Sequence, residues 1–157
     1  MKTIQLKTTE QIYDGEWDII LSIVKNSEIN FSHFYNKKYH KTGQELMMDW
    51  YENEEVNKDE YSCWFKKYYI LFFKEKIIGV VCFDVEDNNA EMIIAVSGRY
   101  KNKGWGKILL LMAENQFVKE YDIKYIWADI YDNDPSLKLF LSCGYLSNGV
   151  EYIKWFK

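Results

Sequence analysis

The chain has 157 residues and a formal net charge of −4, and 48% of its residues are hydrophobic and 18% aromatic. This length is ordinary for one domain, and the apolar content excludes an intrinsically disordered chain. No apolar run is long enough for a transmembrane helix, and the first ten residues lack the apolar stretch of a secretory signal. The three cysteines form no C-x-x-C pair. We therefore expect a single domain over residues 1–157, located in the cytoplasm, with free thiols.

Charge is unevenly distributed along the chain. Residues 1–65 hold 7 lysines and 12 acidic residues, whereas residues 66–157 hold 13 basic and 12 acidic residues. Arg99 is the only arginine. A nucleic-acid-binding protein usually has a basic excess and several arginines for phosphates and base edges. The sequence therefore predicts neither a nucleic-acid partner nor a membrane partner.

The first third of the chain predicts one strand and two helices. Residues Thr3–Lys7 alternate weakly, as in a strand, and apolar residues recur at helical spacing in Glu10–Lys25. Thr8 or Thr9 is the expected cap of that helix. A second helix is expected over Thr42–Val56.

The remaining two thirds alternate between strands and helices. Lys67–Lys74 and Ile77–Val85 are rich in aromatic and branched residues and flank a short turn, which predicts a hairpin. The next elements expected are a strand over Ala90–Val96 and a long helix from Gly106 to about Tyr121, then a strand over Lys124–Tyr131, a short helix over Pro135–Cys143 and closing strands within Tyr145–Phe156. The order β-α-α-β-β-β-α-β-α-β indicates an α/β domain with a mixed sheet.

The segment between the strand at Val96 and the long helix has the composition of an anion site. Gly104 and Gly106 allow the backbone to approach a phosphate closely, and the unpaired N–H groups of a first helical turn favour negative charge. Nearby lysines add positive charge. The alternative is a tight strand-to-helix turn on a lysine-rich surface, and the spacing alone does not decide between the two.

Two better-known glycine motifs do not fit this segment. The dinucleotide pattern G-x-G-x-x-G requires a third glycine where the chain has Leu109. The P-loop pattern requires a hydroxyl residue after Lys107, where the chain has Ile108.

The segment instead resembles the pyrophosphate loop of the GNAT superfamily of acyl-CoA-dependent N-acetyltransferases, [QR]-x-x-G-x-[GA], with Lys101, Gly104 and Gly106 at its fixed positions. A second motif of that family, N-x-x-[AS]-x-x-L-Y-x-x-x-G-[FY], is matched in part by Asn133, Ser136, Leu139, Phe140, Gly144 and Tyr145. The resemblance covers residues 67–146 well, and it implies a central mixed, mostly antiparallel sheet flanked by helices.

The resemblance also implies acetyl-CoA as a co-substrate, no metal, and a set of cofactor-binding residues. The strand end would offer backbone groups to the pantetheine arm, the loop amides would hold the pyrophosphate, and two downstream residues would contact the pantetheine and the region near sulfur. The implied residues are Ile94, Ala95, Val96, Lys101, Asn102, Lys103, Gly104, Trp105, Gly106, Lys107, Asn133 and Phe140.

The chemistry of that family is direct attack of a primary amine on the thioester in a ternary complex, which requires a neutral amine and a stabilised leaving thiolate. Many members have a tyrosine at the position of Phe140 that protonates the thiolate, and phenylalanine cannot do this. Tyr131 is a substitute acid on this interpretation. Glu91 is the candidate base, with a solvent-facing glutamate as the alternative. Asp129 alternates with apolar neighbours and so points either to the cleft or to a sheet face.

The acceptor side of the reaction is left open. Residues 45–60 contain seven acidic residues against Lys58, which is either a solvated surface or a feature that attracts a cationic amine. The surrounding aromatics could wall such a pocket or belong to the core: Phe31, Phe34, Tyr35, Trp50 and Tyr51. The expected acceptor is a small cationic amine or a lysine or peptide amine.

Three further expectations complete the sequence interpretation. His33 and His40 have no cysteine or acidic cluster that would complete a metal site, and Cys143 is expected to be a packed thiol. Members of the GNAT superfamily often form homodimers, so the resemblance leaves open whether this chain forms a homodimer. The alternative function is a degenerate GNAT-like domain that senses acyl-CoA without turnover.

Overall fold

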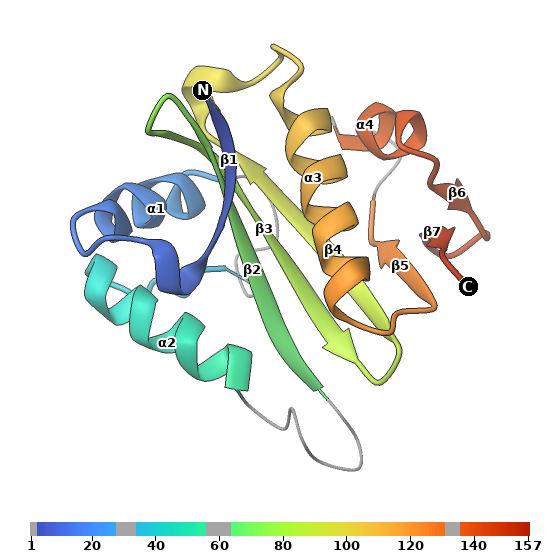
Figure 1. Cartoon of the computed structure of the whole chain (residues 1–157), viewed down its shortest axis with the longest axis horizontal. Coiled ribbons are helices and arrows are strands. Elements are labelled where there is room, and N and C mark those ends of the chain that lie inside the picture. Colours follow the sequence, from blue (N-terminus) through green and yellow to red (C-terminus); the bar gives the residue numbers. More distant parts are fainter. Residues whose placement is uncertain (1–2, 28–33, 56–63, 131–135) are drawn as a thin grey trace.

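A computed structural model describes residues 3–27, 34–55, 64–130 and 136–157. The order of its elements matches the order expected from the sequence (Figure 1). The elements are β1 (Ile4–Thr8), the short 3-10 helix η1 (Thr9–Gln11), α1 (Glu16–Lys25), α2 (Gly43–Glu55), β2 (Trp64–Phe73), β3 (Lys76–Glu86), β4 (Asn89–Val96), η3 (Gly98–Tyr100), α3 (Trp105–Glu120), β5 (Tyr125–Ala128), α4 (Ser136–Ser142), β6 (Leu146–Ser147) and β7 (Tyr152–Trp155).

The strands form one seven-stranded sheet in the order β1-β2-β3-β4-β5-β7-β6. Every neighbouring pair is antiparallel except β4 and β5, which are parallel and are joined through α3. A parallel pair needs such a crossover, because a tight turn cannot return the chain in the same direction. The mixed, mostly antiparallel sheet predicted from the sequence is confirmed.

The first helix begins later than the sequence suggests. α1 starts at Glu16, whereas the apolar period had predicted a helix from Glu10. The Thr8 N–H donates to the Gln11 side chain at 2.9 Å and closes the short turn η1 in front of α1. The Tyr13 N–H donates to the Glu16 carboxylate at 2.9 Å, so a second local hydrogen bond marks the real start of α1.

Two apolar cores lie on the two faces of the sheet. One core packs α3 against the sheet through Leu109, Leu110, Ala113 and Phe117, which recur at helical spacing. The other core packs α1 and α2 against the opposite face through side chains such as Trp50, whose ring stacks on Tyr68 at 4.0 Å. Figure 1 shows α3 crossing in front of the strands, with α1 and α2 at the other side of the sheet.

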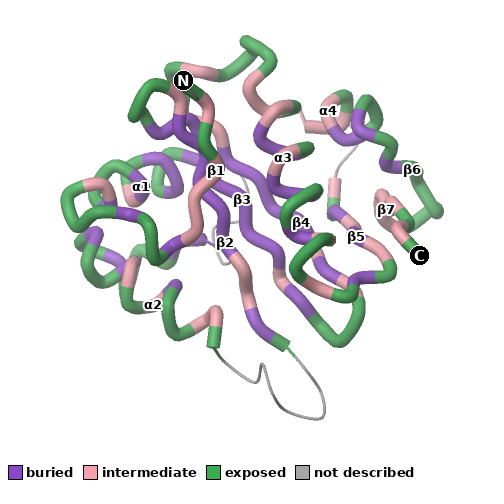
Figure 2. The backbone as a smooth tube through the Cα atoms, in the orientation of Figure 1, coloured by how far each residue is buried: buried purple, intermediate pink, exposed green. Residues whose placement is uncertain are grey.

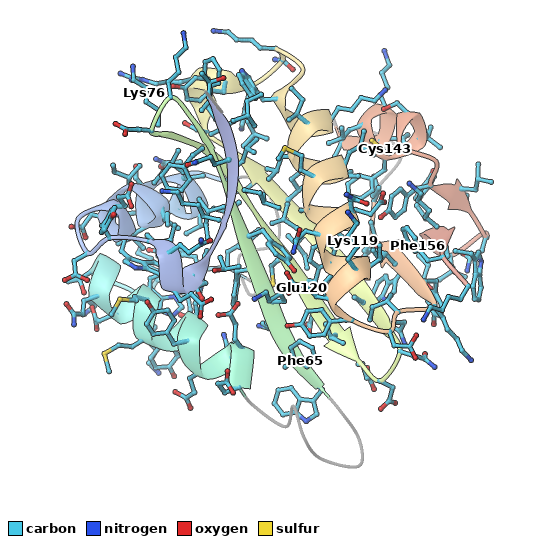
Figure 3. All side chains as sticks on the ribbon, in the orientation of Figure 1. Phe65, Lys76, Lys119, Glu120, Cys143 and Phe156 are labelled. Atoms are coloured by element: carbon cyan, nitrogen blue, oxygen red, sulfur yellow. The ribbon has the colours of Figure 1, made fainter. Side chains whose placement is uncertain are left out.

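A buried ion pair attaches the C-terminal strands to α3. Glu114 has only 7% of its side chain exposed, and it accepts hydrogen bonds from the Lys154 ammonium and the Tyr145 hydroxyl, both at 2.9 Å. The same ammonium donates to the Cys143 carbonyl at 2.8 Å, at the end of α4. Figure 3 shows Cys143 and Phe156 on this C-terminal side of α3. Burial, followed by the charge of Glu114, raises the pKa of Tyr145, so its hydroxyl stays a donor.

Replacing Lys154 by methionine should lower the free energy of unfolding by about 3–5 kcal/mol, because the buried Glu114 carboxylate is then left without a counter-charge. Urea denaturation measures this change. The matched control is Lys157→Met, since Lys157 is 55% exposed and pairs with the exposed Asp122, and such pairs contribute about 0–1 kcal/mol. Equal losses in the two lysine variants would contradict the role given to Lys154.

Candidate active site

The pairing of β4 with β5 stops after three residues, and a cavity lies where the two strands separate. Residues Asn89–Glu91 of β4 pair with Tyr125–Trp127 of β5, and Glu91 with Trp127 is the last of these three pairs. Beyond it, residues 91–96 of β4 form one wall of a cavity of about 880 Å³, and residues 128–130 form another. Residues 92–95 of β4 are buried, so this wall is a strand edge within the protein and not part of its outer surface.

One end of the cavity is formed by the glycine-containing loop before α3. Asn102 and Gly104 both have positive φ values, 60° and 86°, and α3 begins directly afterwards at Trp105. Gly104, Gly106 and Lys107 line the cavity, so the N-terminus of α3 lies beside it, and Lys101 lines the same end. The first N–H groups of a helix have no partner within the helix and carry partial positive charge. This combination of amides, helix dipole and ammonium groups suits a phosphate group.

Gly106 allows α3 to lie close to α4. A Cβ atom built at Gly106 would lie 3.2 Å from the Leu139 side chain, closer than most Cβ contacts. Leu139 and Phe140 of α4 line the cavity together with Ser136. Phe140 is 2% exposed and packs edge-on against Tyr145, with the ring centres 5.0 Å apart.

The other end of the cavity is acidic. Glu91 stands on β4 at the last registered pair with β5, and Asp129 directly follows β5. Ser27, after the end of α1, lines the cavity as well. Glu91 and Val96 are five residues apart on one strand, roughly 16 Å. The cavity thus has a cationic end and an acidic end, separated by a length of buried strand edge that lines the cavity.

The structure brings most of the sequence-predicted site residues into this cavity. Those that line it are Glu91, Ile94, Ala95, Val96, Lys101, Asn102, Gly104, Gly106, Lys107 and Phe140. Lys103, in the loop, and Trp105, the first residue of α3, do not line the cavity. The Trp105 ring packs on Phe73, with the ring centres 4.8 Å apart. Tyr131 and Asn133 lie outside the described residues.

Several cavity residues were missed at the sequence level. Tyr100 and Ser136 bring hydroxyl groups to the cavity, and Ser27 reaches it from a distant part of the chain. No motif marks Ser27, because only the packing of α1 brings it near β4. Asp129 was identified by its alternation with apolar neighbours, and it lines the cavity.

The acidic residues of α2 have structural partners away from the cavity. Asp49 lies 3.0 Å from the ring of His40, which is buried, and Glu54 accepts hydrogen bonds from Thr9 and from the Tyr68 N–H. None of these residues lines the cavity. His40 is therefore a buried histidine with hydrogen-bond partners, whereas His33 lies outside the described residues.

The aromatic residues of this region belong to the core. Phe34, Tyr35 and Trp50 are buried beneath α1 and α2, and the Trp50 indole donates to the Phe34 carbonyl at 3.0 Å. Tyr51 is partly exposed on α2, and Phe31 lies outside the described residues. The core interpretation of these side chains therefore holds for the three buried ones.

The described cysteines are buried thiols. Burial raises the pKa of both Cys82 and Cys143, which disfavours the reactive thiolate. Within the described ranges no group of three or more histidine, cysteine or acidic side chains is placed to hold a metal ion. No helix among these residues is long and apolar enough to cross a membrane.

Comparison with known proteins identifies the family. The model of the acetyltransferase (GNAT) family matches residues 30–145, and the chain belongs to this family of acetyltransferases. Its members use acetyl-CoA as the acetyl donor. A search of curated proteins finds no significant match to the sequence.

Solved structures share the fold at low sequence identity. A GNAT acetyltransferase from Streptococcus pneumoniae aligns with a TM-score of 0.73 at 13% identity, over 98% of this chain and 99% of that chain. A spermidine N-acetyltransferase, SpeG, from Vibrio cholerae aligns with a TM-score of 0.71 at 14% identity, over 98% and 94%. The N-acetyltransferase PseH from Campylobacter jejuni, in complex with acetyl coenzyme A, aligns with a TM-score of 0.64 at 19% identity, over 98% of each chain.

The left-handed backbone at Gly104 gives a test of the loop geometry. Gly104→Ala should lower the free energy of unfolding by about 1–2 kcal/mol, because its φ of 86° is unfavourable for a residue with a Cβ atom. Gly98→Ala, in the same loop with no positive φ and open space around it, should change stability by less than about 0.5 kcal/mol. Thermal or urea denaturation of the two variants measures the difference. Equal stabilities would show that the loop has another conformation.

Proposed function

We propose that this protein transfers an acetyl group from acetyl-CoA to a primary amine by direct attack in a ternary complex. The observation that carries the proposal is a cavity that combines a phosphate-suited loop at one end, a strand edge along its side and carboxylates at the other end. Membership in the acetyltransferase family supports the same reaction. The acceptor is a cationic amine, either small or borne by a peptide.

In this proposal the cofactor lies along β4. The amides of residues 102–107, with Lys101 and Lys107, hold the pyrophosphate, because partial and full positive charges converge there. The strand edge of residues 94–96 offers backbone groups to the pantetheine arm, which needs such partners when it is buried. Phe140 contacts the cofactor near its sulfur. Asn133 remains a predicted contact.

The reaction also needs a group at the acidic end of the cavity that removes a proton from the acceptor amine. Glu91 accepts a proton from the incoming ammonium, and the neutral nitrogen then attacks the thioester carbonyl to form the C–N bond. The C–S bond breaks to release CoA thiolate, and the nitrogen loses its second proton to solvent as the amide forms. Phe140 has no proton to return to that thiolate. Tyr131 is the predicted acid, and water or another hydroxyl group is the alternative source of that proton.

A second function is favoured by Phe140 itself. A domain without the usual tyrosine acid could bind acyl-CoA as a sensor without turning it over. The two functions differ in one observable, the release of free CoA thiol that depends on added amine. The single domain over residues 1–157, the cytoplasmic location and a homodimer also remain predictions.

Gly104→Glu should abolish acetyl-CoA binding, because a bulky anion then occupies the site proposed for the pyrophosphate. Isothermal titration calorimetry at two salt concentrations measures this, and one-to-one wild-type binding should weaken as salt rises. Gly98→Glu is the matched control, since it adds the same charge in the same loop, where an added Cβ meets open space. Intact binding in Gly104→Glu would show that the loop is wrongly assigned.

Glu91→Gln should lower kcat by about 10²–10⁴-fold while leaving the affinity for acetyl-CoA unchanged, because it removes the proposed base and not the phosphate contacts. The lost rate should recover as pH rises, since more of the amine is then already neutral. Rates of thiol release from pH 6 to 10 measure both effects. If Asp129→Asn shows this behaviour and Glu91→Gln does not, the base is Asp129.

A further inference from the structure

The sheet face opposite α3 is divided into two halves of different chemistry. The half beneath α1 and α2 is apolar and covered, and its strand residues include Tyr68, Ile70, Val80, Cys82, Ile93 and Ala95. No described residue of β5 or β7 belongs to that core. Figure 2 shows that the buried residues at the centre of the sheet give way to partly exposed residues along β7 and toward the ends of β2 and β3.

The strand register places two rows of side chains on the other half, which lies outside the core beneath α1 and α2 as far as the described residues show. Successive registered partners from β2 to β7 form one row: Trp64, Glu86, Asn89, Tyr125 and Trp155. The next row, two residues further along each strand, is Lys66, Asp84, Glu91, Trp127 and Ile153. We call these ten residues the open face.

Alternation along the strands shows which way the open face points. The residues between its members, such as Phe65, Val85 and Ile126, belong to the core beneath α3. Since successive strand residues point to opposite sides of a sheet, the open face points away from α3. Figure 3 labels Phe65 at the lower end of the sheet, near the end of α3. Trp64 is 47% exposed and Trp155 is 64% exposed, which is unusual for tryptophan.

The open face combines aromatic and acidic groups. Four of its ten side chains are aromatic and three are acidic, against the single Lys66. Its aromatic part is fixed by contacts within the face. The Trp127 indole donates to Asn89 at 3.2 Å, and the rings of Tyr125 and Trp155 lie 4.7 Å apart. Such a surface complements a partner that is both cationic and partly apolar, because ammonium and guanidinium groups bind carboxylates and aromatic faces alike.

The size of the open face favours a peptide over a small amine. Each row crosses five strands, and the four spacings between neighbouring strands, roughly 4.8 Å each, give the row a length of about 19 Å. An extended peptide covers that length with about six residues, at roughly 3.3 Å for each. The open face is also continuous with the cavity, because Glu91 belongs to both.

We propose that the open face docks a lysine-containing peptide segment of a protein, so that one of its amines enters the cavity beside Glu91. This inference rests on the proposed acetyl transfer and names its acceptor as a protein amine. A second copy of this chain is a poorer occupant, because two-fold pairing of identical faces brings their acidic residues together.

The experiment compares two amine acceptors on the intact protein. A random copolymer of lysine and tyrosine represents a basic, partly apolar peptide, and spermidine represents a small amine. Thiol release gives kcat/KM per amine for each, and fluorescence polarisation gives binding of labelled copolymer to the CoA-saturated protein. The variants are Asp84→Asn combined with Glu86→Gln, and separately Trp155→Ala. The matched controls are Glu75→Gln, on the exposed β2–β3 turn, and Tyr39→Ala, whose side chain is 60% exposed elsewhere.

We expect the copolymer to exceed spermidine by at least tenfold in kcat/KM. The open-face variants should lower copolymer binding and kcat/KM by at least tenfold, and the controls should not. Acetyl-CoA affinity and the rate with spermidine should stay unchanged in every variant, which separates loss of docking from misfolding.

The outcomes separate this inference from the proposed function. If acetyl-CoA binds and spermidine is the better acceptor, or if the open-face variants behave as the controls do, docking is overturned while acetyl transfer stands. If neither amine releases thiol, acetyl transfer fails, and polarisation still decides whether the open face binds the copolymer. A dimer in sedimentation velocity that Trp155→Ala dissociates would overturn docking, because the face would then join two copies.

Discussion

The early end of the β4–β5 pairing is the constraint on which the rest of the site depends. A buried strand edge carries backbone N–H and C=O groups that need partners, and β4 keeps β3 on one side only beyond Glu91 among the described strands. Because residues 92–95 are buried, the open side faces the cavity and not bulk water. A cofactor with amide groups along its length would satisfy that edge in the way a neighbouring strand does. The separation of the two strands therefore creates both the space and the hydrogen-bonding groups that a pantetheine arm requires.

A buried ion pair connects α4, which lines the cavity, to α3 and the C-terminal strand. Lys154 joins the Glu114 carboxylate on α3 to the carbonyl at the end of α4. Tyr145 donates to the same carboxylate and packs against Phe140, which lines the cavity. A charge buried in this way gains little net stability over an apolar pair, but it holds its partners in one geometry as long as each hydrogen bond is satisfied. The position of α4, and so the width of the cavity, depends on this cluster.

Local features of this chain were predictable from the sequence, and long-range features were not. The hairpin and the strand–loop–helix around Gly104 depend on residues a few positions apart, so turn chemistry and apolar period were enough to predict them. The predicted start of α1 was wrong because the apolar period continues through η1. The hydrogen bonds that set the real start of the helix involve Thr8 and Glu16. No role was predicted for Glu114, since nothing near it in the sequence indicates that Lys154 will reach it. The open face was equally hidden, because it requires the register of five strands from Trp64 to Trp155.

The same register explains why the acidic end of the cavity and the open face are one surface. The last β4–β5 pair, Glu91 with Trp127, is where paired sheet becomes separated strands. A carboxylate at that junction has the cavity on one side and a flat aromatic surface on the other. An amine on a flexible lysine side chain can cross such a junction while its backbone remains on the sheet, because the charged group lies several bonds from the backbone. A small free amine contacts only part of a surface that spans five strands, whereas a peptide also covers its aromatic residues, so the placement of Trp64, Trp127 and Trp155 near a carboxylate favours a peptide-borne acceptor.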